Sequence, residues 1–359
     1  MRVTIKDIAR KTGLSISTVS LVLNRKSDRI SEKTIQKVLK TAQEMHYHPN
    51  RIAVGLITKK TQTLGLIIPD IANAFFADIA KGAETECQKQ GYSLILCNTN
   101  DNPLKDVDYV NVLIDKGVDG ILFTMAVSSQ VHKDLQCFHI VQQAEKPMIL
   151  VDRAVQDEDA DSEVPCVSVD NELGGYLATR HLLQLGHKKI GFISGPMGEQ
   201  SAQNRLFGYI KALQEGSVTF DPTLIKVGDY HRETGYRLSG ELIEQGVTAI
   251  FAGNDMMAYG VYKQAKERHL AIPEDLSVMG FDDLEFSQLM EVPLTSMKQP
   301  AYEIGECAVQ KIIRWIEHPE KMPESMRFQP QLVVRESTGN TPPQKFSLKG
   351  RLAENAENS

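Results

Sequence analysis

Cysteine is scarce and scattered in this chain of 359 residues. The cysteines are odd in number and never stand at the CxxC spacing of a zinc or redox motif: Cys87, Cys97, Cys137, Cys166 and Cys307. This pattern predicts reduced core thiols and a cytoplasmic protein. No apolar run approaches the roughly 18 residues of a membrane span, and the first residues do not resemble a secretory signal. We therefore expect no membrane association.

Signatures of catalysis are missing as well. The sequence has no P-loop, no GxSxG nucleophile elbow and no HExxH helix, and its nine histidines are dispersed. Asp282-Asp283 could be paired acids of a glycosidase, but neighbours in sequence need not face one reaction centre. We expect no enzyme, no cofactor and no metal site, and turnover of a pentose would be the observation favouring a sugar-acting enzyme.

Charge is distributed unevenly along the chain. Residues 1–60 hold 13 Lys/Arg against 4 Asp/Glu, a net charge of +9, whereas the whole chain carries −6. The remaining residues therefore carry −15. A basic end on an acidic body favours a polyanion partner for the first segment alone.

The basic segment has the pattern of a helix-turn-helix. Thr4 and Asp7 resemble a capping box that opens a helix reaching about Lys11, and Gly13 ends it. Ser15 caps a second helix over 16–23. Ser31 caps a third, with an apolar face at three- and four-residue steps: Ile35, Val38, Leu39, Ala42 and Met45. We expect Ile8, Ala9, Val19 and Leu23 to complete the small core.

The second helix of such a motif enters the DNA major groove with its N-terminal residues. Its exposed positions are Ile16, Ser17, Ser20 and Leu21, which offer hydroxyls for phosphates or base edges and apolar groups for thymine methyls. Simple packing remains the alternative for Ile16 and Leu21. Phosphate contacts are expected from five basic residues: Lys6, Arg10, Lys33, Lys37 and Arg51.

A short segment after the three helices is predicted to be a hinge. Residues 50–57, capped by Asn50, could form a two-turn helix, which is marginal alone in water. Gly55 costs a further ~1 kcal/mol relative to Ala. We expect this segment to be helical only on DNA, with Leu56 as an apolar wedge at a minor-groove step. A plain linker with a buried Leu56 is the alternative.

From residue 64 the pattern changes to short apolar runs separated by amphipathic helices of about 12–16 residues. The runs predict buried parallel strands at 64–68, 93–97, 120–123 and 148–151, and a second series at 189–193, 249–252 and 276–280. Two such series indicate two α/β lobes with a cleft between them, and ligands bind at the carboxyl ends of parallel strands.

Polar and aromatic residues collect at those strand ends. The set is Asn73, Phe75, Phe76, Asp152, Arg153, Arg205, Asn254, Asp282 and Gln299. Carboxylates accept hydrogen bonds from sugar hydroxyls, Arg and Asn donate to them, and aromatic faces cover sugar C–H surface. Each residue alone has a structural explanation, such as a helix cap or a core ring. Together they predict a sugar site.

Three segments of the basic end resemble the lactose-repressor (LacI/GalR) family of bacterial transcription regulators. They are 3–9 (VTIKDIA), 17–20 (STVS) and 49–53 (PNRIA). The resemblance implies a headpiece, a hinge helix with Leu56 as wedge, and a homodimer on a pseudo-palindromic operator of double-stranded DNA. It implies DNA contacts from Thr4, Lys6, Ile16, Ser17, Thr18, Ser20, Leu21, Asn24, Asn50, Arg51, Ala53 and Leu56. Leu21 departs from the polar reader that the family often carries there.

The body resembles the periplasmic sugar-binding fold, and within it ribose repressors and ribose-binding proteins. The resemblance rests on 73–76 (NAFF), 151–153 (VDR), 170–175 (DNELGG), 251–255 (FAGND) and 280–282 (GFD), among others. It implies that the nine residues above contact the sugar, with Thr124 and Phe207 as further wall residues. Thr124 stands where ribose binders often carry Asn, and Ala74 where they carry Pro, so another pentose or a hexose remains an alternative.

The fold class is therefore α/β with an all-α headpiece. We expect a helix-turn-helix headpiece at 1–48, a hinge helix and linker at 49–62, a two-lobed sugar-binding and dimerisation core of parallel sheets flanked by helices at 63–340, and a disordered tail at 341–359. The expected function is a DNA-binding repressor controlled by a small sugar, most simply ribose. Alternatives are a catabolite-control regulator that responds to a phosphorylated partner protein, and a sugar-binding transport module.

Overall fold

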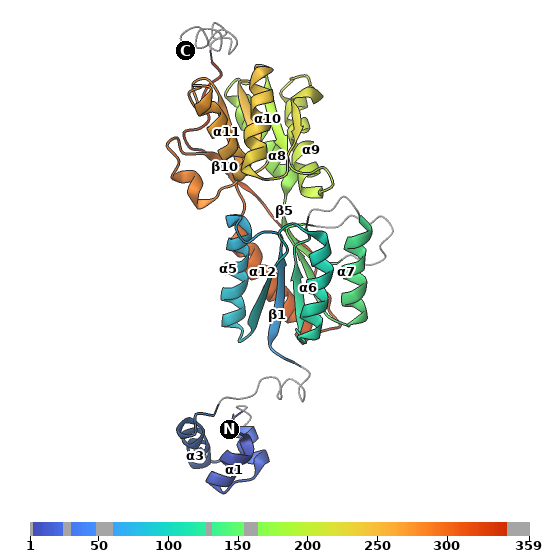
Figure 1. Cartoon of the computed structure of the whole chain (residues 1–359), viewed down its shortest axis with the longest axis vertical. Coiled ribbons are helices and arrows are strands. Elements are labelled where there is room, and N and C mark those ends of the chain that lie inside the picture. The colour runs from blue at the N-terminus through green and yellow to red at the C-terminus, as the bar shows by residue number, and fades with distance from the viewer. Residues whose placement is uncertain (1–2, 24–29, 48–59, 127–130, 154–163, 343–359) are drawn as a thin grey trace. The chain divides into compact units, whose positions relative to one another are not determined.

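The computed structural model describes residues 3–23, 30–47, 60–126, 131–153 and 164–342 (Figure 1). The chain divides into two compact units, Met1–Thr61 and Gln62–Ser359. The predicted contact residues Asn24, Asn50, Arg51, Ala53 and Leu56 lie outside the described residues, as do most of the predicted hinge and tail. Within the described ranges, no helix is long and apolar enough to cross a bilayer.

The first unit holds three helices, α1 (Ile5–Thr12), α2 (Ile16–Leu23) and α3 (Glu32–Glu44). The capping box of Thr4 and Asp7 is confirmed, with the Thr4 amide donating to the Asp7 carboxylate at 2.9 Å. The Thr4 hydroxyl also donates to this carboxylate, at 2.7 Å. Gly13 ends α1 with φ +68°, and the amide of Thr18 donates to Ser15 Oγ at the start of α2. These local signals set the helix boundaries that the sequence predicts.

The core of the first unit consists of Ile8, Ala9, Val19, Val22, Val38 and Ala42. Leu23 packs partly buried against it, as do Ile35 and Met45. The sequence pattern predicts Leu39 on the apolar face of α3, and this prediction is wrong, because Leu39 is 47% exposed. The buried stripe of α3 is narrower than the sequence pattern suggests.

The second unit begins with lobe 1, a six-stranded sheet in the order β11-β5-β4-β3-β1-β2. Its strands are β1 (Thr63–Ile68), β2 (Ser93–Asn98), β3 (Gly120–Phe123), β4 (Met148–Val151), β5 (Cys166–Val169) and β11 (Met326–Phe328). Its helices are α5 (Ala74–Lys89), α6 (Pro103–Asp115), α7 (Val131–Gln143) and α12 (Ala301–Glu317). Leu64, Leu66 and Ile68 face the α5 and α12 side, and Ile67 faces the other, so both faces are buried.

Lobe 2 repeats this plan with a sheet in the order β12-β10-β9-β8-β6-β7. Its strands are β6 (Ile190–Ser194), β7 (Ile225–Val227), β8 (Ala249–Ala252), β9 (Ser277–Asp282), β10 (Thr295–Lys298) and β12 (Gln331–Val333). Its α-helices are α8 (Asn171–Gln184), α9 (Gln200–Glu215), α10 (Arg232–Glu244) and α11 (Asp255–Glu267), with short 3₁₀ turns η1 (Pro222–Leu224) and η2 (Glu285–Gln288). All pairings in both sheets are parallel except that between β10 and β12.

Among the described residues, the chain passes between the lobes at three places. The first crossing joins β5 to α8 at Asp170, the second joins β10 to α12 at Gln299-Pro300, and the third joins β11 to β12 at 329–330. The predicted α/β class and two-lobed architecture are thus confirmed. The sequence reading missed β5, β7, β11 and β12, which are three or four residues long.

Candidate functional site

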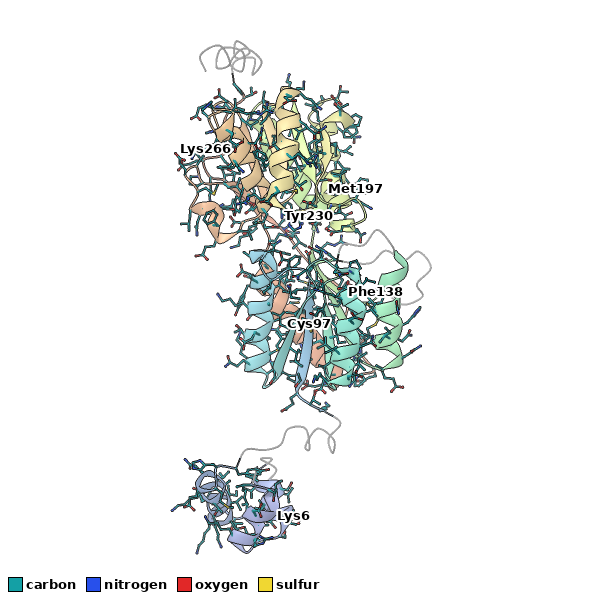
Figure 2. The ribbon with its side chains drawn as sticks, in the orientation of Figure 1. Lys6, Cys97, Phe138, Met197, Tyr230 and Lys266 are labelled. Atoms are coloured by element: carbon teal, nitrogen blue, oxygen red, sulfur yellow. The ribbon has the colours of Figure 1, made fainter. Side chains whose placement is uncertain are left out.

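A cavity of about 130 Å³ lies between the two lobes at the carboxyl ends of their strands. Figure 2 labels Tyr230 on the lobe 2 side of this cleft. All nine residues of the predicted constellation line the cavity: Asn73, Phe75, Phe76, Asp152, Arg153, Arg205, Asn254, Asp282 and Gln299. Their convergence follows from topology, because each lies at the end of a strand or in the first two turns of the helix that follows.

Two further predicted wall residues are not among those that line the cavity. Phe207 is 56% exposed on α9 and does not line the cavity. Successive helix residues turn by about 100°, so Phe207 points away from the side on which Arg205 faces the cleft. Thr124 directly follows β3 and is fully buried; its amide donates to the Ile67 carbonyl, and its Oγ1 has no hydrogen-bond partner among the described residues.

Lobe 1 supplies an aromatic wall. Asn73 caps α5 by accepting a hydrogen bond from the amide of Phe75 at 3.1 Å, which fixes the start of the helix at the cavity. The rings of Phe75 and Phe76 meet edge to face, with centroids 5.2 Å apart. The guanidinium of Arg153 lies over the Phe76 ring at 5.6 Å.

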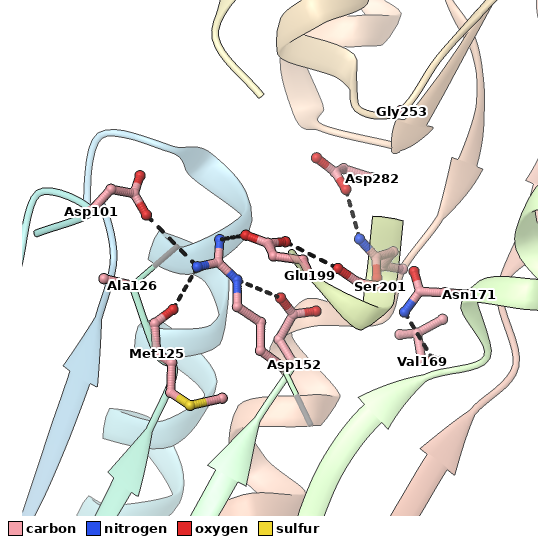
Figure 3. Close-up of polar contacts among 12 residues, drawn as sticks. Asp101, Met125, Ala126, Asp152, Val169, Asn171, Glu199, Ser201, Gly253 and Asp282 are labelled. Atoms are coloured by element: carbon pink, nitrogen blue, oxygen red, sulfur yellow. Dashed lines mark hydrogen bonds and ion pairs between the residues drawn. The ribbon is translucent and has the colours of Figure 1, made fainter. Parts of the chain in front are cut away.

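Arg153 is buried among carboxylates. Its nitrogen atoms lie 3.7 Å from Asp101, 4.0 Å from Asp152 and 3.3 Å from Glu199, and Nη1 donates to the Met125 carbonyl. Figure 3 shows Asp101, Asp152 and Glu199 around this guanidinium. Glu199 belongs to lobe 2, so its ion pair with Arg153 spans the cleft.

Arg205 has a different environment in lobe 2. Its Nε donates to Asn171 Oδ1 at 2.7 Å and Nη1 donates to the Gly253 carbonyl at 2.5 Å. The guanidinium stacks on the Phe281 ring at 3.9 Å. Neutral partners and a ring therefore orient this buried cation.

Two acids of the cavity have perturbed pKa values. Burial raises the pKa of Asp152 to about 6; Arg153 and Arg205 lower it, and Glu199 raises it. Burial also raises the pKa of Asp282 well above its ordinary range, and Arg205 opposes this. Gln299 Nε2 donates to Asp282 Oδ1 at 2.6 Å. Asp282 has φ +122°, an uncommon conformation for a residue with a side chain.

Several buried atoms of the cavity lack a hydrogen-bond partner among the described residues. They are Asp101 Oδ1, Asp152 Oδ1, Arg153 Nε, Glu199 Oε1, Tyr230 Oη and Gln299 Oε1. Four of these atoms accept hydrogen bonds, Arg153 Nε donates, and the Tyr230 hydroxyl can do either. Buried polar atoms are nearly always paired, so the cavity suits a ligand rich in hydrogen-bond donors.

Some lining residues were not foreseen from the sequence: Asp70, Ala72, Asp101, Glu199, Ser201, Asp229, Tyr230, His231 and Met256. Tyr230 and Asp229 follow the short strand β7, which the reading missed. Glu199 lies in the loop before α9 and carries no periodic signal. Only knowledge of which loops reach the cleft could have identified these residues.

The first unit carries the candidate nucleic-acid interface. Helix α2 has no charged residue, and Ile16 and Leu21 are 51% and 44% exposed. Ser17 is exposed beside them, and its hydroxyl shares a hydrogen bond with Ser15. Thr18 is half-buried and bonded to Ser15, and Ser20 is half-buried. Thr4 caps α1 and Lys6, labelled in Figure 2, is exposed, whereas Lys37 Nζ donates to the Thr12 carbonyl.

A two-lobed binding protein that carries a three-helix headpiece defines a class of ligand-responsive DNA-binding regulators. Two family models match the chain. "Periplasmic binding proteins and sugar binding domain of LacI family" covers residues 61–336, and "Bacterial regulatory proteins, lacI family" covers residues 4–50. The chain belongs to the LacI family of bacterial transcriptional regulators.

The similar proteins are regulators, not enzymes. The transcriptional repressor PurR of Vibrio atlanticus is 34% identical over 334 residues, which is 92% of this chain and 97% of the relative. A lac repressor dimer bound to operator and the anti-inducer ONPF is 26% identical, with a TM-score of 0.83, and the match covers 94% of this chain and all of that one. A LacI-family regulator from Enterococcus faecium with bound ribose is 29% identical, with TM-score 0.67, and covers 77% of this chain and 98% of that one.

Proposed function

We propose that this protein is a transcriptional repressor whose affinity for a pseudo-palindromic operator is controlled by a monosaccharide, ribose in the first place, bound between the lobes. The observation that carries the proposal is that two buried acceptors at the cavity, Asp152 Oδ1 and Gln299 Oε1, lack a hydrogen bond, beside the rings of Phe75 and Phe76. Sugar hydroxyls would donate to Asp152 and Gln299 while the rings cover the C–H face.

The size of the cavity supports a small effector. Its volume of about 130 Å³ is below the roughly 300–1,000 Å³ of pockets that hold drug-sized ligands. A ribose-bound regulator of the same family shares the fold of this body. The nine predicted residues provide the mixture of charge, amide and ring that a pentose requires.

On the DNA side, α2 would lie in the major groove with Ile16, Ser17 and Leu21 towards the bases. Lys6 and Arg10 would contact phosphates, which makes binding dependent on salt. Leu56, outside the described residues, would wedge into the minor groove. We expect Leu56→Ala to weaken operator binding and leave sugar affinity unchanged; equal loss of both would reject the wedge.

We propose a homodimer, joined in lobe 2 by the groove between α11 and residues 284–292. Phe286 and Leu289 are 59% and 68% exposed there, and the Phe286 ring packs edge to face on Tyr259. Basic side chains line the α11 side and acidic ones the other: Lys263, Lys266, Glu285 and Glu291. A two-fold axis would pair the basic side of one copy with the acidic side of the other.

Sugar binding would change the angle between the lobes, since the cavity is built from both of them. A ligand shifts such an equilibrium only by its difference in affinity for the two arrangements. We expect the closed, sugar-bound dimer to hold its hinge segments in a geometry that no longer fits DNA. The protein would act in the cytoplasm, where its operator is.

The test combines a ligand screen with operator binding by the full chain. A true effector raises the melting temperature by mass action, and we expect ribose or another pentose to do so and to weaken operator binding. Gln299→Leu should lose the sugar shift, whereas Gln214→Leu, an exposed change on α9, should retain it. Operator binding that responds to a phosphorylated protein and to no sugar would overturn the proposal, as would catalytic turnover of the sugar.

A further inference from the structure

The carboxylate of Glu199 lines the cavity, although its position in the chain would allow it to cap a helix. Glu199 stands at the N-cap position of α9, yet its side chain makes no capping hydrogen bond. It is only 8% exposed. Oε1 lies 3.3 Å from Arg153 Nη2 across the cleft, and Oε2 accepts a hydrogen bond from Ser201 Oγ at 3.2 Å.

We propose that Glu199 is a specificity-determining residue that restricts the effector to uncharged sugars and excludes their phosphate esters and sugar acids. This inference rests on the proposed function and specifies the chemical class of its ligand. A repressor of this kind would respond to a sugar before it is phosphorylated.

The charges of the cavity carry the argument. Six carboxylates and two guanidinium groups line the cavity: Asp70, Asp101, Asp152, Glu199, Asp229 and Asp282 against Arg153 and Arg205. Arg153 already has three of these carboxylates within 4.0 Å. It therefore has no uncompensated charge to offer a phosphate.

Arg205 does not restore a place for an anion. Its Nε and Nη1 are bonded to Asn171 and Gly253, and one face of the group lies on Phe281. Asp152 and Asp282 are close enough to Arg205 for its charge to lower their pKa values. An anion bound beside Arg205 would also lie beside these two acids. Asp152, with a pKa of about 6, is ionised at neutral pH, and like charges repel strongly where water is excluded.

Among these carboxylates, Glu199 discriminates against anions but is not needed for the sugar contacts at Asp152 and Gln299. It belongs to lobe 2, and among the ion pairs of the described residues it meets lobe 1 only through Arg153. Replacing it by Gln keeps the size and a hydrogen-bonding oxygen while removing one negative charge. The sugar should still bind, and the penalty against an anion should fall.

The experiment is calorimetric titration of the full chain with D-ribose and D-ribose 5-phosphate, and with the free and phosphorylated forms of any other sugar that the screen identifies. We expect the wild-type protein to bind the phosphate ester at least 100-fold more weakly than the free sugar. Glu199→Gln should narrow this ratio about tenfold or more. Glu172→Gln, an exposed change on α8 that faces Lys211, should leave the ratio unchanged.

Two results would overturn the inference while leaving the sugar-controlled repressor intact. One is a phosphate ester that binds the wild-type protein within tenfold of the free sugar. The other is a Glu199→Gln protein that is folded by its melting curve and has an unchanged ratio; Glu199→Asp, which keeps the charge, should retain the wild-type ratio. If no sugar in either form binds, the proposed function itself has failed.

Discussion

The carbonyl oxygen of Arg205 lies 2.2 Å from the place where a Cβ atom on Gly175 would stand. The reciprocal contact is equally close, since a Cβ on Gly208 would lie 2.1 Å from the carbonyl oxygen of Glu172. Helices α8 and α9 thus touch through their backbones at the turn that carries Arg205. This close approach sets where the guanidinium enters the cavity.

Gly175→Ala should therefore destabilise lobe 2 and weaken sugar binding together. Overpacking of this kind typically costs 1–3 kcal/mol, and separation of the helices would move Arg205 from Asn171 and Gly253. Chemical denaturation and calorimetric sugar titration measure the two effects. Gly216→Ala is the control, because a Cβ there meets the flexible end of Leu183 at 2.9 Å, and we expect little change. Full stability with normal binding in Gly175→Ala would contradict the helix contact.

Asp152 should make sugar affinity depend on pH. Its pKa of about 6 in the folded protein is above the ordinary 3.8, so its ionisation lowers the free energy of unfolding as pH rises between these values. Hydroxyls that donate to the carboxylate favour the ionised form. We expect sugar affinity to decrease as pH falls below about 6, measured by titration from pH 5 to 7.5.

Asp152→Asn should reduce this dependence, with the remainder coming from Asp282, whose pKa is also raised by burial. Asp78→Asn, an exposed change on α5, should keep the wild-type profile. A wild-type affinity that stays constant over this range would show that the Asp152 carboxylate does not accept hydrogen bonds from the ligand.

Ile16 and Leu39 form a matched pair on the first unit, since they are 51% and 47% exposed. Only Ile16 lies on α2. We expect Ile16→Ala to weaken binding to an operator selected from random duplex DNA about tenfold, because contacts to a thymine methyl are lost. Leu39→Ala should bind normally. Fluorescence anisotropy measures both, and equal losses would remove α2 as the reading helix.

Leu289 and Phe207 test whether the groove beside α11 is the dimer interface. Both are exposed in lobe 2, at 68% and 56%, but only Leu289 lines the groove beside α11. Leu289→Asp should shift the protein from dimer to monomer in analytical ultracentrifugation at micromolar concentration, because a charge would be buried without a partner. Phe207→Asp should remain dimeric. A dimer that survives Leu289→Asp would place the contact elsewhere.

The helices and strands were predictable wherever a single local sequence signal defines them. Thr4 with Asp7, Gly13 and Ser15 define the first two helices through local hydrogen bonds, and the apolar runs define the central strands because both sheet faces are buried. The edge strands β7 and β12 escaped, since three partly exposed residues resemble a loop. Leu39 was misassigned because an apolar residue at the border of a helix stripe can point to solvent.

The site was predictable for residues that follow long strands. Asp152, Asn254 and Asp282 are placed by the rule that ligands lie at carboxyl ends of parallel strands. Two aromatic residues show the limit of this rule. Phe207 points outward because of its position on the turn of helix α9, whereas Tyr230 points into the cavity because it follows β7, a strand that the sequence did not predict. Glu199 reaches the site because the loop that carries it faces the opposite lobe, and no periodicity in the sequence indicates this.

The position of Gln299 has a mechanical consequence. It stands on the second crossing between the lobes and donates to Asp282 at the end of β9, so a ligand that contacts it acts on the backbone torsions about which the lobes rotate. A small rotation there produces a displacement that grows with distance from the axis. Inserting one residue into this connection should leave sugar binding intact but uncouple it from rotation of the lobes. Sugar affinity would then be retained, while sugar would no longer control operator binding.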